Sequence, residues 1–326
     1  MTGAGSLART SSVPLEGRIG IALGSGAARG WAHIGVLRGL EEAGVAPDFV
    51  CGSSVGAVVG AAYASGRLDA FERWVRALDR SQVVRNLDVA FRGGLIKAAR
   101  FFQFMAEELP DGDIETLPRP FAAVATDLES GREVWLREGS LHDALRASVA
   151  MPGLITPVAR RGRWMVDGGL TNPVPVSLCR AMGADSVIAV DLNTTLLGRR
   201  FPQPAPVSLG ANAPTVAAST VEATEDGALE GSALWSVVHS WAGELRGRLR
   251  GVAASESYDL PSIYDVVANS LNIMQVRVTR SRMAGDPPDL LVAPKLANFA
   301  LLDIDRAAEA IEEGRRALAQ ALASGG

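Results

Sequence analysis

Short apolar runs alternate with amphipathic stretches over most of the chain. A run of about four to eight apolar residues predicts a buried strand, and apolar residues spaced three or four apart predict a helix. By this pattern the predicted strands are residues 18–23, 48–51, 121–126, 133–136, 186–191 and 290–292. The predicted helices are residues 31–44, 55–64, 141–150, 174–182, 234–249, 263–283 and 304–322. Strands that alternate with helices predict an α/β protein with a mainly parallel sheet that is covered on both faces.

The same pattern divides the chain into four parts. Residues 1–17 lack periodicity and are expected to form a flexible tail, whereas residues 18–193 have the strand–helix alternation of an α/β core. Residues 194–232 are rich in Pro, Ala, Gly, Thr and Ser, which predicts a flexible polar insert. Residues 233–326 are mostly helical in pattern, and we expect them to pack on the same domain as the core.

Composition narrows the class of protein. Of the 326 residues, 48% are hydrophobic and 21% are charged, which excludes a disordered chain. The 32 basic residues are balanced by 36 acidic ones, so the net charge gives no reason to expect a nucleic-acid partner. The two cysteines, Cys51 and Cys179, are too few for a disulfide framework and indicate a reducing compartment.

Neither a signal peptide nor a membrane span is predicted. The first 18 residues contain no apolar stretch long enough for the core of a signal peptide. The longest uncharged run extends from Phe49 to Gly66, but four glycines and three serines interrupt it, unlike a lipid-facing helix. We therefore expect a cytoplasmic protein, and transient contact with the inner face of the membrane stays open.

The segment Gly52-Ser53-Ser54-Val55-Gly56 has the pattern G-x-S-x-G between a predicted strand and a predicted helix. At such a turn the serine lies on strained backbone with its hydroxyl presented to a cleft, and the glycines let the two elements approach closely. Because the chain has 35 glycines, a tight turn without catalysis is the alternative interpretation. Ser54 is the candidate nucleophile of this motif.

A glycine-rich turn, Gly24-Ser25-Gly26-Ala27-Ala28-Arg29-Gly30, follows the first predicted strand. Small residues here let consecutive backbone N–H groups point into one concavity, where they can bind a phosphate or the oxyanion of a tetrahedral intermediate. A dinucleotide fingerprint requires glycine where Arg29 stands, and a P-loop requires a lysine that this turn lacks. A plain strand-to-helix turn is the alternative.

A third motif, Asp167-Gly168-Gly169, follows the apolar run Trp164-Met165-Val166. A carboxylate on a glycine loop at the end of a strand can reach into a cleft and act as a base. Aspartate followed by two glycines is also typical of a plain turn.

In this order the three motifs resemble those of the patatin-like phospholipases, especially their bacterial, NTE-related branch of the RssA type. The resemblance extends from Arg18 to the last predicted helix and leaves out the tail and the polar insert. It is carried by the segments GSGAARGWAHIGVLRGLEEAG, FAAVATDLESGREVW, RASVAMPGLITPV, VDGGLTNPVPVSL and SRMAGDPPDLLVAP. One departure is Ala27, which stands where families with three consecutive glycines have the third, although a small residue still presents its N–H.

The resemblance implies a three-layer α/β/α patatin-like fold and a serine esterase that degrades lipids. In that family pattern Ser54 is the nucleophile and Asp167 the general base of a catalytic dyad. The backbone N–H groups of Gly26, Ala27 and Ala28 form the oxyanion hole. The residues that support these motifs are Gly24, Arg29, Gly30, Gly52, Gly56, Gly168 and Gly169. The implied substrates are acyl esters of phospholipids, lysophospholipids or related lipids, which are cleaved through an acyl-enzyme.

Three alternatives stay open. Ser54, Asp191 and His239 occur in the chain order of an α/β-hydrolase triad, which is a rival mechanism for the same hydrolysis. The fold could instead bind a lipid or a protein without catalysis, or transfer the acyl group to an acceptor other than water. No group of Cys, His and carboxylate residues has the spacing of metal ligands, so neither a metal nor a cofactor is expected.

Overall fold

The structure is a computed structural model that describes residues 15–78, 88–90, 95–97, 102, 107–194, 263–300 and 303–324. The chain divides into two compact units, one made of residues 1–199 with 267–326 and the other of residues 200–266. Nearly all described residues belong to the first unit. The fold and the site below are those of this unit.

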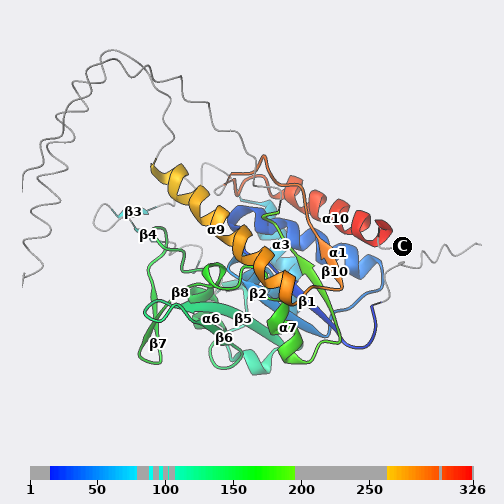
Figure 1. Ribbon diagram of the computed structural model, residues 1–326, viewed down its shortest axis with the longest axis horizontal. Helices are drawn as coiled ribbons and strands as arrows, with labels where there is room; N and C mark the ends of the chain where they lie inside the picture. Colours follow the sequence, from blue (N-terminus) through cyan, green and yellow to red (C-terminus); the bar gives the residue numbers. More distant parts are fainter. Residues whose placement is uncertain are drawn as a thin grey trace, which may run out of the picture. The chain divides into compact units, whose positions relative to one another are not determined.

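A mixed sheet of eight strands forms its centre, in the order β10-β9-β1-β2-β5-β8-β7 with β6 paired to β5 (Figure 1). Its strands are β1 (Ile19–Leu23), β2 (Phe49–Ser53), β5 (Phe121–Asp127), β6 (Glu133–Leu136), β7 (Val158–Arg160), β8 (Arg163–Asp167), β9 (Ser186–Val190) and β10 (Leu290–Val292). The pairs from β10 to β5 are parallel, whereas β6, β7 and β8 pair antiparallel. A separate antiparallel pair consists of β3 (Asp88–Ala90) and β4 (Leu95–Lys97).

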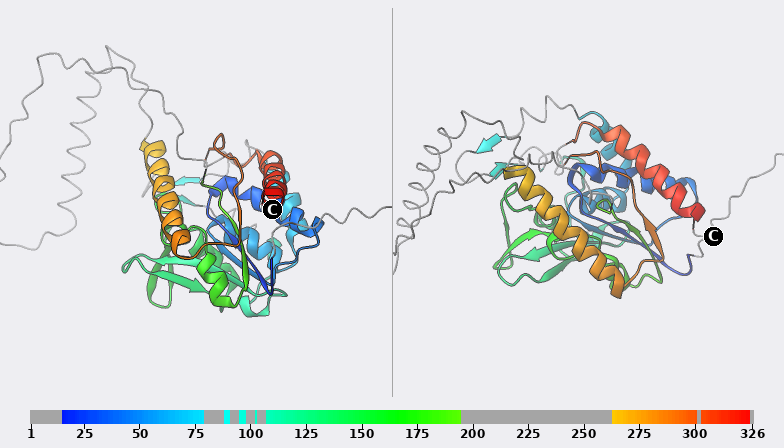
Figure 2. Two further views of the ribbon diagram at one scale, coloured as in Figure 1. Left: turned by 45° about the vertical axis from the view of Figure 1, so that its right-hand side comes forward. Right: turned by 45° about the horizontal axis from the view of Figure 1, so that its top comes forward.

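Helices cover both faces of the sheet. One face is covered by α1 (Ala32–Glu42), α2 (Val55–Ala64), α3 (Leu68–Arg76), α6 (Leu141–Ser148) and α10 (Ala307–Ser324), and the other by α7 (Val176–Met182) and α9 (Ile263–Gly285). The left view of Figure 2 shows α9 and α10 on opposite sides of the strands. Ile21 and Leu23 of β1 belong to the apolar core under α1, and Ala22 between them belongs to the core under α7. A strand that is buried on both faces explains the uninterrupted apolar runs in the sequence.

The predicted three-layer α/β/α arrangement with a mainly parallel sheet is confirmed. Val55–Ala64, Glu133–Leu136 and Leu290–Val292 have the predicted bounds. The helix predicted from Val174 begins instead at Val176, because Pro175 disfavours helical backbone at the residue before it. The helix predicted over 234–249 and nearly all of the insert predicted over 194–232 lie outside the described residues.

Besides the β3–β4 pair, two further features were not predicted from the sequence. Helix α3 follows α2 after a short turn, and β7 and β8 form a hairpin whose turn contains Arg161 and Gly162, both at positive φ. The apolar run of the hairpin is limited to Trp164-Met165-Val166 of β8, since all three residues of β7 and the first two of β8 are partly or fully exposed. A search for apolar runs therefore does not identify this hairpin, although it identifies β6 at the same antiparallel end of the sheet.

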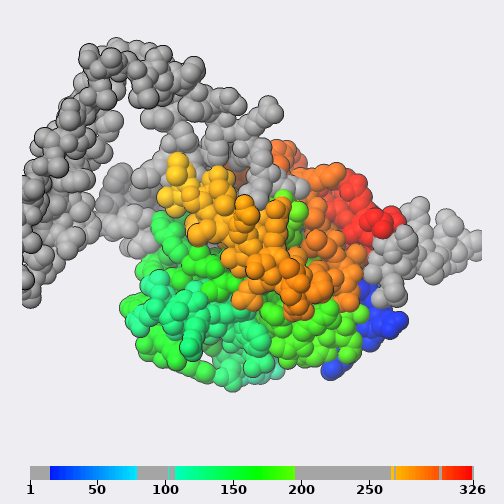
Figure 3. Space-filling view, in the orientation of Figure 1, coloured from blue at the N-terminus to red at the C-terminus, as the bar shows by residue number. Residues whose placement is uncertain are grey.

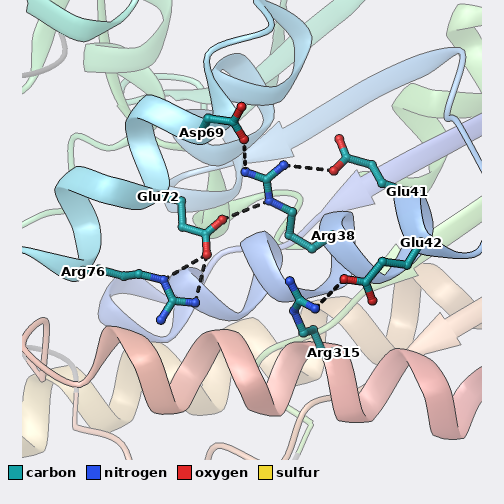
Figure 4. Close-up of polar contacts among 7 residues, drawn as sticks. All are labelled: Arg38, Glu41, Glu42, Asp69, Glu72, Arg76 and Arg315. Carbon is teal, nitrogen blue, oxygen red and sulfur yellow. Dashed lines mark hydrogen bonds and ion pairs between the residues drawn. The ribbon is translucent and has the colours of Figure 1, made fainter.

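A polar network joins α1, α3 and α10 on the first face (Figure 4). Arg38 of α1 donates to Glu72 at 2.9 Å and to Glu41 at 3.0 Å, and it also pairs with Asp69. Glu72 in turn pairs with Arg76. A further ion pair, between Arg315 and Glu42, joins α10 to α1. The pair of Arg38 with Glu72 is partly buried, whereas the pairs with Asp69 and Glu42 have exposed carboxylates and contribute roughly 0–1 kcal/mol each. The network thus orients helices that the apolar core already holds.

Helices α1 and α10 touch backbone to backbone. A Cβ built on Gly314 of α10 would lie 2.0 Å from the carbonyl oxygen of Ala32, and one built on Gly35 of α1 would lie 1.8 Å from that of Ile311. Both distances are far below a contact that a real side chain tolerates. Glycine is required here because the two helices cross without room for a methyl group.

The substitution Gly314→Ala is expected to lower the free energy of unfolding by about 1–3 kcal/mol, since the helices must separate to accommodate the methyl group. Helix propensity alone favours alanine over glycine by about 1 kcal/mol and would make the variant more stable. The expected loss of stability therefore has the opposite sign and reports the clash between the helices. Urea denaturation measures the difference. Gly285→Ala is the matched control, because no heavy atom lies within 4 Å of a Cβ at that helical glycine. A Gly314→Ala protein as stable as the wild type would contradict the close crossing.

Candidate active site

Ser54 lies at the sharp turn from β2 into α2. Its backbone has φ 55° and ψ −126°, a conformation that side chains rarely adopt, and the residue is 4% exposed. A Cβ on Gly52 would lie 2.4 Å from the backbone nitrogen of Ala57, and one on Gly56 would lie 2.1 Å from the carbonyl oxygen of Leu23. The two glycines therefore allow the strand and helix to meet closely enough to form this turn.

The register of β5 brings Asp167 to the same place. Residues Ala123–Thr126 of β5 pair with β6 on one edge. On the opposite edge β2 pairs as far as Ser53 with Val124, and β8 takes over with Asp167 beside Ala125. The last residues of β2 and β8 thus meet end to end along one edge of β5. Ser54 is the next residue after β2, so the serine and the aspartate become neighbours although they lie 113 positions apart in the sequence.

A short hydrogen bond joins the two side chains. The Oγ of Ser54 donates to Oδ2 of Asp167 at 2.6 Å, and the N–H of Gly169 donates to Oδ1 at 2.7 Å. Asp167 is only 1% exposed. Burial raises the pKa of Asp167 from 3.8 to about 6, although the hydrogen bonds from Ser54 and Gly169 favour the charged form and oppose the rise. The carboxylate is therefore a stronger base than an ordinary aspartate.

Other buried polar groups fix the backbone of both residues. The hydroxyl of Thr126 donates to the carbonyl of Asp167 at 2.9 Å, and the N–H of Asp167 donates to Ala150 at 3.0 Å. The N–H of Ser54 donates to the hydroxyl of Ser148 at 3.0 Å, so this N–H is not available to a substrate oxygen. Sequence reasoning missed Thr126 and Ser148, although both lie in segments that carry the family resemblance.

The glycine-rich turn lies beside the serine. The N–H of Gly24 donates to Val190 at 3.0 Å, and the N–H of Arg29 donates back to Gly26 at 3.2 Å. In the described part of the chain, the N–H groups of Gly26, Ala27 and Ala28 have no backbone acceptor. Ala27 has φ 49°, in the left-handed region that favours glycine. Gly30 packs against Val55, which follows Ser54.

A cleft of about 290 Å³, which includes the space open to solvent, lies between these elements. It is lined by Ser25, Gly26, Ala27, Arg29, Ser54, Met151, Leu271, Asn272 and Gln275. Of the three predicted oxyanion residues, Gly26 and Ala27 line the cleft, whereas Ala28 is buried beside it. Gly168 and Gly169 begin the short 3-10 turn Gly168–Leu170 directly after Asp167.

Polar residues from distant segments hold the glycine-rich turn in place. The side chain of Arg29 is 2% exposed and donates to Asn193 at 3.2 Å and to Asn272 at 3.0 Å. Asn193 donates to the carbonyl of Ser25 at 3.2 Å, and Gln275 accepts from the hydroxyl of Ser25 at 3.1 Å. Asn193, Asn272 and Gln275 were missed in the sequence because no local pattern distinguishes them from surface amides.

His33 supports the same turn from inside α1. Its Nε2 lies 2.7 Å from the carbonyl oxygen of Gly24, and the side chain is fully buried. Burial lowers the pKa of His33 to about 4, although the hydrogen bond to Gly24 favours the charged form. The neutral ring therefore donates through Nε2 to Gly24 and orients the turn.

The rival triad would pair Ser54 with His239 and Asp191. Asp191 follows β9, and its carboxylate accepts from the N–H of Asn193 at 2.9 Å and from the hydroxyl of Thr194 at 2.6 Å. His239 lies outside the described residues.

Among the described side chains, no three His, Cys, Asp or Glu residues are grouped as a metal site requires. Over the same residues, every helix is too short or too polar to cross a bilayer.

Comparison with known proteins places this geometry in a family. A family model described as patatin-like phospholipase matches residues 21–180. An uncharacterized NTE family protein of Mycobacterium tuberculosis is 36% identical over 337 residues, which span 96% of this chain and 93% of that protein. Patatin-like phospholipase domain-containing protein 6 of Homo sapiens is 34% identical over 194 residues, or 57% of this chain and 14% of that protein.

A solved structure has a similar fold. VipD from Legionella pneumophila superposes with a TM-score of 0.50 and 13% sequence identity, over 95% of this chain and 67% of that one. At this identity the likeness concerns the fold alone. The family match and the nearly full-length relative decide the assignment: the chain belongs to the patatin-like phospholipase family, in its NTE-related branch.

Proposed function

We propose that the protein hydrolyses acyl ester bonds of phospholipids, lysophospholipids or related lipids, with Ser54 as nucleophile and Asp167 as general base. Membership of the patatin-like phospholipase family supports a lipid acyl hydrolase in general. The observation that carries the specific proposal is the 2.6 Å hydrogen bond from Ser54 Oγ to a buried carboxylate at a strained turn.

In the first step Ser54 Oγ attacks the ester carbonyl carbon while its proton moves to Asp167 Oδ2. An ordinary aspartate is a weak base for a hydroxyl, but burial makes Asp167 more basic, and the short hydrogen bond lets the transfer accompany the attack. Gly169 holds the other carboxylate oxygen, so the accepting oxygen stays aimed at the serine. A well-placed general base accelerates such a step by roughly 10²–10⁴-fold.

The negative charge that develops on the carbonyl oxygen needs donors that are already oriented. The N–H groups of Gly26 and Ala27 line the cleft beside Ser54, and Ala28 follows them in the same turn. The N–H of Ser54 is engaged by Ser148, so the glycine-rich turn is the better source of donors. Each donor of this kind is worth roughly 10²–10³-fold in rate.

The tetrahedral intermediate then collapses. The bond from carbon to the leaving alkoxide breaks, and Asp167 returns its proton to that oxygen, which leaves an acyl group on Ser54. Water enters, gives a proton to Asp167 and attacks the acyl carbon. The second intermediate releases the fatty acid and restores the Ser54 hydroxyl with the proton from Asp167.

Ser54→Ala is expected to abolish turnover of a p-nitrophenyl ester and of lysophosphatidylcholine, and Asp167→Asn is expected to reduce it severely. Ser54→Ala lacks the nucleophile, and Asp167→Asn is expected to lose roughly 10²–10⁴-fold in kcat/KM because the amide cannot accept the proton. Initial-rate kinetics on the purified variants measures both effects. Ser65→Ala, at the end of the same helix α2, is the matched control and is expected to keep the wild-type rate.

His239→Ala separates the dyad from the rival triad. We expect this variant to keep its activity, since the proposed base is Asp167. An inactive His239→Ala protein together with an active Asp167→Asn protein would contradict the dyad.

Activity is expected to rise with pH through an apparent pKa of about 6, because only the ionised form of Asp167 accepts the serine proton. At pH 5, one unit below that pKa, about a tenth of the carboxyl groups are ionised, so kcat/KM should be about tenfold below its plateau. A pH–rate profile between pH 5 and 8 measures this limb. The residual activity of Asp167→Asn should lack the limb, and a wild-type profile that is flat over this range would count against Asp167 as the base.

A further inference from the structure

Helix α9 lies on the surface of the molecule, across the face of the sheet that also carries α7 (Figures 1 and 3). Its inward side carries several polar residues beside Val276, which is 1% exposed. Asn272 hydrogen-bonds Arg29, Gln275 accepts from Ser25, and Arg282 donates to the carbonyl of Thr171 at 2.7 Å. Thr279 on the same side is only 2% exposed. This side of α9 therefore bridges the glycine-rich turn and the loop after Asp167.

The outward side of α9 carries apolar residues. Val267 is 50% exposed, Ile273 is 41% exposed and Met274 is 52% exposed. A surface helix in water ordinarily turns its apolar side chains inward and its polar side chains outward. Helix α9 departs from this rule in part, because its buried side carries polar residues beside Val276 and its exposed side carries aliphatic residues beside Arg277 and Arg280. Exposed apolar side chains that gather on one helix indicate a surface that meets an apolar partner.

Part of this surface runs from solvent into the cleft. Val267, Leu271, Met274 and Val278 are spaced i, i+4, i+7 and i+11, so they form one stripe along α9, which we call the apolar flank. Leu271 lines the cleft that contains Ser54, whereas Met274 and Val267 on either side of it are exposed. The apolar flank is therefore continuous with the wall of the cleft.

Positive charge accompanies the apolar flank. Residues 267–285 contain three arginines and no acidic residue, although the whole chain has a net charge of −4. Arg282 pairs with Glu133. Arg277 and Arg280 are exposed, and no ion pair among the described residues involves either of them. Arg277 borders the apolar flank, since it follows Met274 by three residues, and Arg280 follows Arg277 by three residues on the exposed side of α9. Exposed arginines next to an apolar stripe complement a surface that has anionic groups above an apolar layer.

We propose that the apolar flank, with Arg277 and Arg280, docks the protein on an anionic phospholipid bilayer, and that Leu271 guides an acyl chain from the bilayer into the cleft. The choice of a bilayer rests on the proposed function, since a lipid substrate must pass from a membrane to Ser54. A protein partner on the same flank would cover this approach to the cleft. A bilayer supplies both the apolar and the anionic contacts and the substrate as well.

Vesicle co-sedimentation of the full chain tests the docking surface. Ser54→Ala serves as the background so that no lipid is consumed, and the vesicles are phosphatidylcholine alone or a 3:1 mixture with phosphatidylglycerol. We expect binding to the mixed vesicles, and Val267→Ser with Met274→Ser should weaken it about tenfold by loss of apolar burial. Arg277→Gln with Arg280→Gln should weaken it by about tenfold or more and remove its dependence on phosphatidylglycerol and on salt.

Leu291→Ser is the matched control, because Leu291 is 42% exposed on β10, outside α9, and its loss should leave vesicle binding unchanged. With Ser54 intact, all these variants should hydrolyse a water-soluble ester at the wild-type rate, which shows that they fold. If the wild type hydrolyses no ester but vesicle binding still depends on the apolar flank, the docking surface stands and the proposed function fails.

Two results would overturn the docking surface. One is a full chain that does not bind mixed vesicles, or flank variants that bind them as well as their parent. The other is a dimer, seen in sedimentation velocity, that dissociates in the Val267→Ser, Met274→Ser variant while vesicle binding stays unchanged. That result would show that the apolar flank binds a second copy of the chain.

Discussion

The end-to-end meeting of β2 and β8 on one edge of β5 is the constraint on which the site depends. A parallel strand delivers Ser54 from one direction and an antiparallel strand delivers Asp167 from the other, so the hydroxyl and the carboxylate come within 2.6 Å. If the sheet were fully parallel, a strand in the place of β8 would run in the same direction as β2, and its last residue would lie away from the end of β2. The antiparallel end of the sheet is thus the part of the fold that builds the proposed dyad.

The surroundings hold several groups in conformations that are unfavourable by themselves. Ser54 and Ala27 have positive φ, which costs a residue with a side chain about 1–3 kcal/mol, and Asp167 is a buried carboxyl group. The close packing at Gly52 and Gly56 holds this geometry, together with the hydrogen bond that Thr126 donates to Asp167 and the one that Ser148 accepts from Ser54. Strain that is concentrated where a serine meets a base is the usual signature of a site for chemistry.

Sequence reasoning reached the fold class because apolar periodicity reports burial, and β1, β2, β5 and β9 are buried on both faces. It could not reach the β7–β8 hairpin, whose half-exposed residues lack that signal. Ser54 and Asp167 stood out because glycines mark their turns. Asn193 and Gln275 did not, since their importance arises from contacts with Ser25 across 168 and 250 positions of the chain. The buried polar residues of α9 likewise became visible only with its neighbours in place.

Reactivity of Ser54 toward a fluorophosphonate tests the central claim most directly, because the phosphorus centre is attacked only by a hydroxyl that a nearby base activates. Peptide mass spectrometry of the labelled protein locates the adduct. The account predicts one phosphonylated residue, Ser54, with no adduct in Ser54→Ala and far slower labelling in Asp167→Asn. Labelling at another serine, or equal labelling rates in the wild type and Asp167→Asn, would contradict it.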